Sequence, residues 1–251
     1  QQVGGAGRIG KGDMGEHGAI IGAARGRGNG CARPASGQDA GMEFAGIILA
    51  GGASRRMQAG AVPIDKALLS LAGQPMIAHV IARLGCARAI SANGDPARFA
   101  PFGLPVLADG VPDRPGPLAG VLAGMDWAAA QGFRRVVTAA ADTPFAPRHL
   151  AEALIGAGGP VAIATHAGRD HPTMAAWDVD LRDALRVALA AGMRRPVAFA
   201  DSVGARRVDF TGDDPFLDDP FFNVNTPDDL ARAERRARRL KPRGHSAGRC
   251  I

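Results

Sequence analysis

Apolar positions along the chain alternate between short continuous runs and longer stretches with helical spacing. Runs such as residues 44–48 and 135–140 are typical of strands that are buried on both faces of a sheet. Between them, apolar side chains recur every three or four positions, as expected for one face of a helix: Met76, Ile77, Val80, Ile81 and Leu84. Strands that alternate with helices in this way favour a sheet covered by helices on both sides.

The same patterns predict the order of elements along the chain. A first strand is expected from residue 44, ending at residues 47–50, and further strands are expected at residues 67–71, 88–92, 104–108, 135–140, 161–165, 173–177 and 207–210. Helices are expected to begin at Pro75 and Pro117 and to cover residues 147–157, 181–191 and 227–240. Residues 167–172 are expected to form a loop between two strands. The predicted fold class is α/β, a three-layer Rossmann-like sandwich with a mostly parallel sheet.

The two ends of the chain differ from the middle. Residues 1–42 hold 13 of the 35 glycines and no sustained apolar periodicity, so we expect a disordered or spurious extension, with Met42 as the true start. Residues 43–240 are expected to form one domain. Residues 241–251 are expected to be a basic, flexible tail.

Composition narrows the class of protein. The chain has 251 residues, of which 46% are hydrophobic and 22% are charged, and no apolar run is long enough for a transmembrane helix. No signal peptide is evident, and the three cysteines are scattered without the spacing of a disulfide framework or a zinc site, which favours the cytoplasm.

The formal charge of +6 belongs to the ends of the chain. Residues 1–42 carry a net charge of +2 and residues 231–251 carry +7, which leaves −3 for residues 43–230. An arginine-rich end can bind nucleic acid without specificity. A solvated helix end that continues into a polar tail explains the same residues, so we expect no specific nucleic acid and no membrane partner.

A glycine-rich passage follows the first predicted strand. Residues 49–66 read LAGGASRRMQAGAVPIDK, and paired glycines after a buried strand let backbone N–H groups approach a phosphate. Arg55, Arg56 and Lys66 then occupy positions where the charge of a triphosphate would need to be met. The passage matches neither the Walker loop nor the dinucleotide fingerprint.

Groups suited to binding a polar ligand follow four successive strands. They are Asn93 and Asp95, Asp109, and Asp142, in addition to the glycines after the first strand. Ligands of open α/β sheets bind at the carboxyl ends of the strands, so we expect these groups to converge on one crevice.

Several of these residues have two interpretations. Asp142 is the preferred ligand for Mg²⁺, although an aspartate there could instead cap the next helix. Asn93 and Asp109 suit a base or ribose edge, but Asn-Gly and Asp-Gly are also common turn dipeptides. The glycines of residues 116–120 could open a helix toward an anion or could permit close helix–sheet packing.

Four residues near the end of the domain are candidates for binding an acceptor substrate. His171 and Arg169 belong to the predicted loop, and a lone histidine beside proline is more often structural than catalytic. Asn223 and Asn225 flank Val224 on a predicted strand that leads to Thr226 at a helix start. Because they are two positions apart on that strand, their side chains are expected to point the same way. They could line a pocket or satisfy loop backbone.

Together these motifs resemble the molybdenum cofactor guanylyltransferases, which are nucleotidyltransferases of the nucleotide-diphospho-sugar transferase type. The similarity covers residues 44–235 and is carried, in order, by LAGGASRRM, DKALLSLAGQPMIAHV, ANGD, RPGPLAG, ADTPF, RDHPT and FFNVNTPDDLA. The first and fifth motifs are shared with related nucleotidyltransferases. PGPLAG, RDHPT and NVNTP are more specific.

The resemblance implies an activity and assigns residues to it. The family transfers GMP from GTP to molybdopterin that carries molybdenum, and releases pyrophosphate. Residues implied to bind the nucleotide are Leu49, Ala50, Gly51, Gly52, Lys66, Asp109 and Asp142, with Mg²⁺ on Asp142. The base contact falls on either Ser91 or Asn93, since the family places an asparagine at the position of Ser91. Residues 58–64 form a longer spacer than the family usually has.

The implied chemistry agrees with the residue types. The terminal phosphate of molybdopterin is already an anionic nucleophile, so positioning and charge neutralisation by Arg55, Arg56, Lys66 and Asp142 with its metal ion suffice. The partners implied are GTP and molybdopterin, with molybdoenzymes or other proteins of the cofactor pathway as further possibilities. The alternatives are a CTP-dependent or sugar-phosphate nucleotidyltransferase of the same fold and a non-catalytic cofactor carrier.

Overall fold

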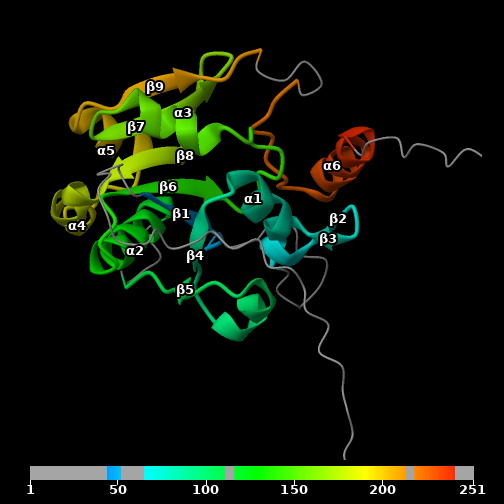
Figure 1. Cartoon of the computed structure of the whole chain (residues 1–251), viewed down its shortest axis with the longest axis horizontal. Coiled ribbons are helices and arrows are strands. Elements are labelled where there is room, and N and C mark those ends of the chain that lie inside the picture. Colours follow the sequence, from blue (N-terminus) through cyan, green and yellow to red (C-terminus); the bar gives the residue numbers. More distant parts are fainter. Residues whose placement is uncertain (1–43, 52–64, 111–115, 213–217, 241–251) are drawn as a thin grey trace, which may run out of the picture. The chain divides into compact units, whose positions relative to one another are not determined.

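The computed structural model describes residues 44–51, 65–110, 116–212 and 218–240. Its main sheet has seven strands in the order β5-β4-β1-β6-β8-β7-β9 (Figure 1). The strands are β1 (Phe44–Leu49), β4 (Ala87–Ser91), β5 (Val106–Leu107), β6 (Arg135–Ala140), β7 (Val161–His166), β8 (Arg169–Asp178) and β9 (Arg206–Asp209). All neighbours pair in parallel except at β8, which runs antiparallel to β6 and β7. The prediction of a mostly parallel sheet is confirmed.

Helices cover both faces of the sheet, as the three-layer prediction requires. On one face, α1 (Met76–Leu84) and α3 (Leu150–Ala157) pack against Ile48, Ile90 and Val137. On the other face, α2 (Pro117–Ala130), α4 (Arg182–Ala190) and α5 (Pro196–Ser202) enclose Ile47, Val136 and Trp177. Adjacent residues of one strand thus enter different cores, which is why the central strands read as continuous apolar runs.

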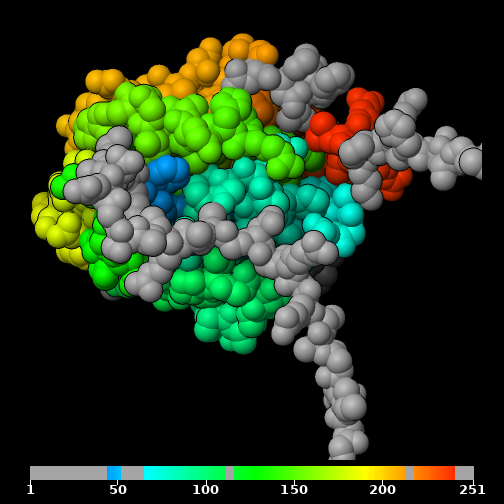
Figure 2. Space-filling view, in the orientation of Figure 1, coloured from blue at the N-terminus to red at the C-terminus, as the bar shows by residue number. Residues whose placement is uncertain are grey.

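A third apolar cluster holds the last helix, α6 (Pro227–Leu240). It joins α6 to the small hairpin of β2 (Ser70–Leu71) and β3 (Gln74–Pro75), and its buried members are Leu71, Met76, Phe145, Phe222, Val224 and Ala233. The neighbouring positions of α6 and the hairpin are visible in Figures 1 and 2. The guanidinium groups of Arg232 and Arg236 each lie 4.8 Å from the centre of the Phe222 ring, so part of the arginine-rich helix packs on the domain.

Local chemistry explains the start of α6. The Thr226 hydroxyl accepts a hydrogen bond from the Asp229 N–H, and the Asp229 carboxylate accepts from the N–H groups of Asn225 and Thr226. This is a reciprocal capping arrangement followed by Pro227 in the first turn. The predicted role of Thr226 at the helix start is confirmed.

The predicted loop at residues 167–172 is wrong. Residues 169–172 belong to β8, which pairs with β7 through the two-residue turn Ala167–Gly168. Both turn residues have positive φ (48° and 74°), as tight hairpin turns require. Pro172 is tolerated because the β7–β8 register jumps there: Ile163 pairs with Ala175, while Ala164 pairs with His171.

Smaller differences concern short elements. Lys66–Leu68 is a 3-10 helix (η1) where an extended run was expected, because the Asp65 carboxylate accepts from the Ala67 N–H and caps a turn. The 3-10 helices η2 (Pro96–Phe102) and η3 (Val179–Leu181) and helix α5 were not predicted. Asn223–Asn225 is not a strand, although the Val224 N–H donates to the Asp142 carbonyl oxygen.

Three glycines let elements approach closely. A Cβ at Gly120 or Gly124 of α2 would lie 2.7 Å from the Ser91 hydroxyl or 3.0 Å from Ile47, respectively. A Cβ at Gly46 of β1 would lie 2.8 Å from the Cys86 carbonyl oxygen, which already accepts from the Gly46 N–H. Side chains at these positions would push α2 or β4 away from β1.

We therefore expect Gly46→Ala to lower the free energy of unfolding by about 1–3 kcal/mol, the usual penalty for overpacking. The strained contact is with backbone, which cannot rotate away. Gly156→Ala is the matched control, because Gly156 is exposed on α3 with open space at its Cβ. The control should be neutral or up to about 1 kcal/mol more stable. Urea unfolding measures both, and equal stabilities would contradict the close approach.

Candidate nucleotide-binding site at the carboxyl edge of the sheet

A cavity of about 430 Å³ lies where the chain order of the sheet reverses. After β1 the chain builds β4 and β5 on one side and then returns to β6 on the other side of β1. Loops that leave in opposite directions open a crevice at the carboxyl ends of these strands. The lining residues are Leu49, Ala50, Gly51, Asp65, Lys66, Ala67, Ser91, Asp109, Gly116, Pro117, Gly120, Ala140, Ala141, Asp142, Thr173, Asn223 and Asn225.

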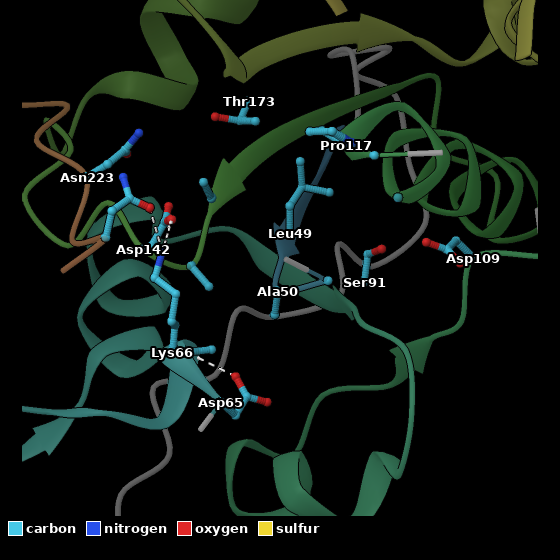
Figure 3. A pocket seen from close by; sticks show the side chains of 17 residues that line it. Leu49, Ala50, Asp65, Lys66, Ser91, Asp109, Pro117, Asp142, Thr173 and Asn223 are labelled. Atoms are coloured by element: carbon cyan, nitrogen blue, oxygen red, sulfur yellow. Dashed lines mark hydrogen bonds and ion pairs between the residues drawn. The ribbon is translucent and has the colours of Figure 1, made fainter. Parts of the chain in front are cut away.

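One end of the cavity carries opposite charges in direct contact. The Lys66 ammonium lies 3.1 Å from the Asp142 carboxylate and 2.6 Å from the Asn225 side-chain oxygen, to which it donates (Figure 3). The Lys66 and Asp142 side chains are 15% and 28% exposed, so the pair is partly shielded and still reachable from solvent. Asn223 completes this end and accepts from the Thr143 hydroxyl.

The opposite end carries polar groups with fixed orientation. Ser91 and Asp109 line the cavity on the far side of Leu49 and Ala50 from Lys66 and Asp142 (Figure 3). Asn93 does not line it. Its amide donates to the Asp109 carboxylate (2.6 Å) and accepts from the Asp109 N–H (3.1 Å). Of the two candidates for the base contact, Ser91 faces the cavity, and Asn93 holds Asp109 in place.

The start of α2 closes the cavity between these two ends. Gly116 precedes the helix with φ 85° and ψ −161°, a conformation open only to glycine, and Pro117 occupies the first turn. Both line the cavity, so the positive end of the helix dipole faces it. Gly120 also lets α2 approach Ser91, so close helix–sheet packing, one of the two alternatives for these glycines, is confirmed. Binding of an anion at this helix start stays a prediction.

The predicted convergence is confirmed for Gly51, Asp109 and Asp142, which line one cavity, and is wrong for Asn93 and Asp95, which do not line it. The Asp95 carboxylate instead accepts from the Ala97 N–H and caps η2. Leu49, Ala50, Gly51, Lys66, Ser91, Asp109, Asp142, Asn223 and Asn225 share one cavity. Gly52, Arg55 and Arg56 lie outside the described residues. Asn223 and Asn225 both line the cavity.

The structure does not bring Arg169 and His171 to the cavity. Arg169 starts β8 at the hairpin turn and is exposed, and the His171 ring lies 4.6 Å from the ring of Phe221. The cause is the tight Ala167–Gly168 turn, which places both residues inside a strand. Thr173 reaches the cavity instead, from the irregular part of β8.

Sequence reasoning missed Asp65, Pro117 and Thr173 as lining residues. For Thr173 a signal was present, because a proline inside a strand marks a bulge, and bulges redirect side chains beside active sites. Asp65 was visible only as the neighbour of Lys66.

Two further findings concern metal ions and membranes. Across residues 44–51, 65–110, 116–212 and 218–240, no group of three or more His, Cys, Asp or Glu side chains is placed so that it could hold a metal ion by itself. Within the same residues, each helix is too short or too polar to span a bilayer.

Comparison with known proteins gives consistent matches. Residues 46–204 match the model of the MobA-like NTP transferase domain. The chain is 48% identical over 202 residues to a protein of Mesorhizobium japonicum and 50% identical over 197 residues to one of Cereibacter sphaeroides. Both are named molybdenum cofactor guanylyltransferase, and each match covers 77% of this chain and 95% or 96% of the relative.

A solved structure agrees with this result. Molybdopterin-guanine dinucleotide biosynthesis protein A from Archaeoglobus fulgidus is 25% identical, with a TM-score of 0.60. The match covers 78% of this chain and 99% of that chain.

The burial of His171 predicts how the free energy of unfolding depends on pH. Burial lowers the pKa of His171 below its ordinary value, and the nearby Asp219 carboxylate only partly opposes this. The unfolded chain therefore binds a proton at higher pH than the folded one, and His171 reduces stability as the pH falls below about 6.5. We expect the unfolding free energy of His171→Gln to fall less than that of the wild type between pH 7.5 and pH 5.5. Parallel losses in urea unfolding would contradict a neutral, buried His171.

Proposed function

The chain belongs to the MobA-like NTP transferase family and is a nucleotidyltransferase, and from this premise we propose how its site works as a molybdenum cofactor guanylyltransferase. It transfers GMP from GTP to molybdenum-loaded molybdopterin, which yields the guanine dinucleotide cofactor and pyrophosphate. The observation that carries the proposal is the cavity at the carboxyl edge, with Lys66 and Asp142 at one end and Ser91 and Asp109 at the other. The cytoplasm is the proposed location, on the grounds of the scattered cysteines.

In the proposed complex the nucleotide spans the cavity from end to end. The guanine and ribose lie against Ser91 and Asp109, with Pro117 and Gly116 beside them. The triphosphate crosses the backbone of Leu49, Ala50 and Gly51 toward Lys66. Hydrogen-bonding groups at the base end distinguish nucleotides because a wrong base leaves them unpaired.

The proposed reaction is an in-line displacement at the α-phosphorus of GTP. An oxygen of the molybdopterin phosphate forms the new P–O bond, and the bond from the α-phosphorus to its bridging oxygen breaks. Both electrons of that bond leave with pyrophosphate, so the step needs neither an oxidant nor a general base. Lys66 offsets negative charge on the phosphates, and Arg55 and Arg56 are proposed to do the same.

The residues present suit Mg²⁺ in one particular way. Asp142 provides a partly exposed carboxylate, and the side chains of Asn223 and Asn225 bring amide oxygens beside it. Mg²⁺ favours oxygen ligands and commonly binds through one or two carboxylates together with substrate phosphates. A bound ion would neutralise charge on the triphosphate. We therefore propose Asp142 as the protein ligand of a metal site that the nucleotide completes.

Asn223, Asn225 and Thr173 are proposed to face the acceptor. All three line the cavity. In Figure 3, Asn223 lies next to Asp142, and Thr173 lies above Asp142 and Leu49. Arg169 and His171 are not retained in this role, because neither reaches the cavity.

Incubation with GTP, Mg²⁺ and molybdenum-loaded molybdopterin tests the activity. We expect release of pyrophosphate together with formation of the guanine dinucleotide. CTP in place of GTP is the matched control and should give little product. Product from CTP alone would assign the CTP-dependent alternative. Binding of the dinucleotide without turnover would assign a carrier.

The base preference should also be visible in binding. Calorimetry should show at least about tenfold tighter binding of GTP than of CTP, equivalent to about 1.4 kcal/mol. The physical reason is the set of hydrogen-bonding groups around Ser91 and Asp109, which a mismatched base leaves unsatisfied. Equal affinities would remove the guanine assignment.

Asp142→Asn and Lys66→Ala separate the metal ligand from the phosphate contact. Each should lower turnover by about 10²-fold or more, as expected for lost electrostatic stabilisation of the transition state. Only Asp142→Asn should raise the Mg²⁺ concentration for half-maximal rate. Lys66→Ala should leave that concentration unchanged or lower it, because the substitution frees Asp142 from its ion pair.

Arg186→Ala is the control for these variants. Arg186 pairs with Asp126 on the surface of α4 and α2, outside the cavity lining, and its loss should leave turnover near the wild-type value. Normal turnover and a normal Mg²⁺ response in Asp142→Asn would remove the metal assignment.

A further inference from the structure

Arg98 of η2 lies outside the cavity lining and uses all three guanidinium nitrogens. Its Nε donates to the Asp65 carboxylate (2.7 Å), and its two terminal nitrogens donate to the carbonyl oxygens of Asn93 and Asp95 (2.6 Å each). The guanidinium also lies 4.5 Å from the centre of the Phe99 ring. These contacts hold the planar guanidinium group of Arg98 in one orientation.

One set of contacts from Arg98 leads to the phosphate end of the cavity. Asp65 accepts from Arg98 through one carboxylate oxygen and from the Ala67 N–H through the other. It thereby caps the short helix η1, in which Lys66 is the first residue. The ion pair with Arg98 fixes the segment that presents Lys66 to Asp142.

The other set of contacts leads to the nucleoside end. Arg98 binds the backbone of the turn at residues 93–95, and the Asn93 side chain in that turn makes two hydrogen bonds to Asp109. Gly94 has φ 87°, and a Cβ there would lie 3.2 Å from a terminal nitrogen of Arg98. The turn therefore fits closely around the guanidinium.

We propose that Arg98 is a positioning residue that couples the nucleoside end of the site to its phosphate end. The inference rests on the proposed nucleotide site. A series of hydrogen bonds connects the two ends. Asn93 binds Asp109 at the nucleoside end, and Arg98 binds the Asn93 carbonyl oxygen. Arg98 also binds Asp65, which caps the helix that carries Lys66. Arg98 itself touches neither substrate.

Arg98→Ala and Arg98→Lys test this coupling because they remove different contacts. Alanine removes all of them. Lysine keeps a positive charge for Asp65 but has a single nitrogen, which cannot occupy three donor positions at once. The alanine variant should weaken ligand binding at both ends of the site, and the lysine variant should weaken it only at the nucleoside end.

The measurement uses one ligand for each end. Pyrophosphate with Mg²⁺ reports on the phosphate end. Guanosine or cytidine, whichever the wild type binds more tightly, reports on the nucleoside end. Ligand-observed NMR titrations give both affinities without requiring turnover. Arg186→Ala is the matched control and should leave both affinities unchanged, because that arginine pairs with Asp126 outside the cavity lining.

Arg98→Ala should weaken the binding of the nucleoside and the binding of pyrophosphate by at least about fivefold each. Arg98→Lys should bind pyrophosphate within about twofold of the wild type and still bind the nucleoside at least about fivefold more weakly. A general loss of folding would affect both ligands alike in both variants. If Arg98→Ala does not fold, the lysine variant carries the test alone.

The coupling is overturned if Arg98→Ala leaves either of the two affinities unchanged. It is also overturned if Arg98→Lys changes both affinities to the same extent, or changes neither of them. A wild type that prefers cytidine would overturn the guanine assignment and leave the test of Arg98 intact. A wild type that binds neither nucleosides nor pyrophosphate would overturn both proposals.

Discussion

The position of β1 between two parallel partners is the constraint on which the site depends. Because β4 and β6 both run parallel to β1, no hairpin can close across its carboxyl end. The segments that follow β1 and β5 cross in opposite directions, the first to reach β4 and the second to reach β6. The space between those crossovers is the cavity. Gly46, Gly120 and Gly124 let β4 and α2 approach β1 closely enough for Ser91 and the start of α2 to form its walls. The close packing of β4 and α2 against β1 therefore shapes the cavity at the carboxyl ends of these strands.

The charged end of the cavity is built from segments far apart in the sequence. Lys66, Asp142 and Asn225 meet because a separate apolar cluster packs α6 against the β2–β3 hairpin that follows Lys66. The same cluster contains Val224, whose N–H donates to the Asp142 carbonyl oxygen. Asp229 then caps α6 and binds the Asn225 N–H. Helix α6 thus supports the site without lining it.

Sequence patterns predicted the parts of this structure that local rules determine. Apolar runs marked the central strands, and Pro75, Pro117 and Thr226 marked helix starts, because these signals act over a few residues. The strand at residues 169–172 was missed because Gly168 and Pro172 normally interrupt strands, whereas here the first completes a hairpin turn and the second lies in a bulge. Asp65 and Thr173 were missed as lining residues because their positions depend on pairing between distant segments.

The contact between Lys66 and Asp142 also bears on how the site meets its substrate. A partly buried ammonium and carboxylate hold each other in place and lower the desolvation penalty that either would have alone. In the proposed complex, a triphosphate with its metal ion would offer both groups new partners of the same charge signs: phosphate oxygens for Lys66 and a cation for Asp142. Binding in this proposal would exchange one set of ionic contacts for another, with the Asn225 side-chain oxygen as a neutral acceptor for Lys66. Because the lysine and the carboxylate are already oriented toward the cavity, little reorganisation is required when charge develops on the departing phosphates.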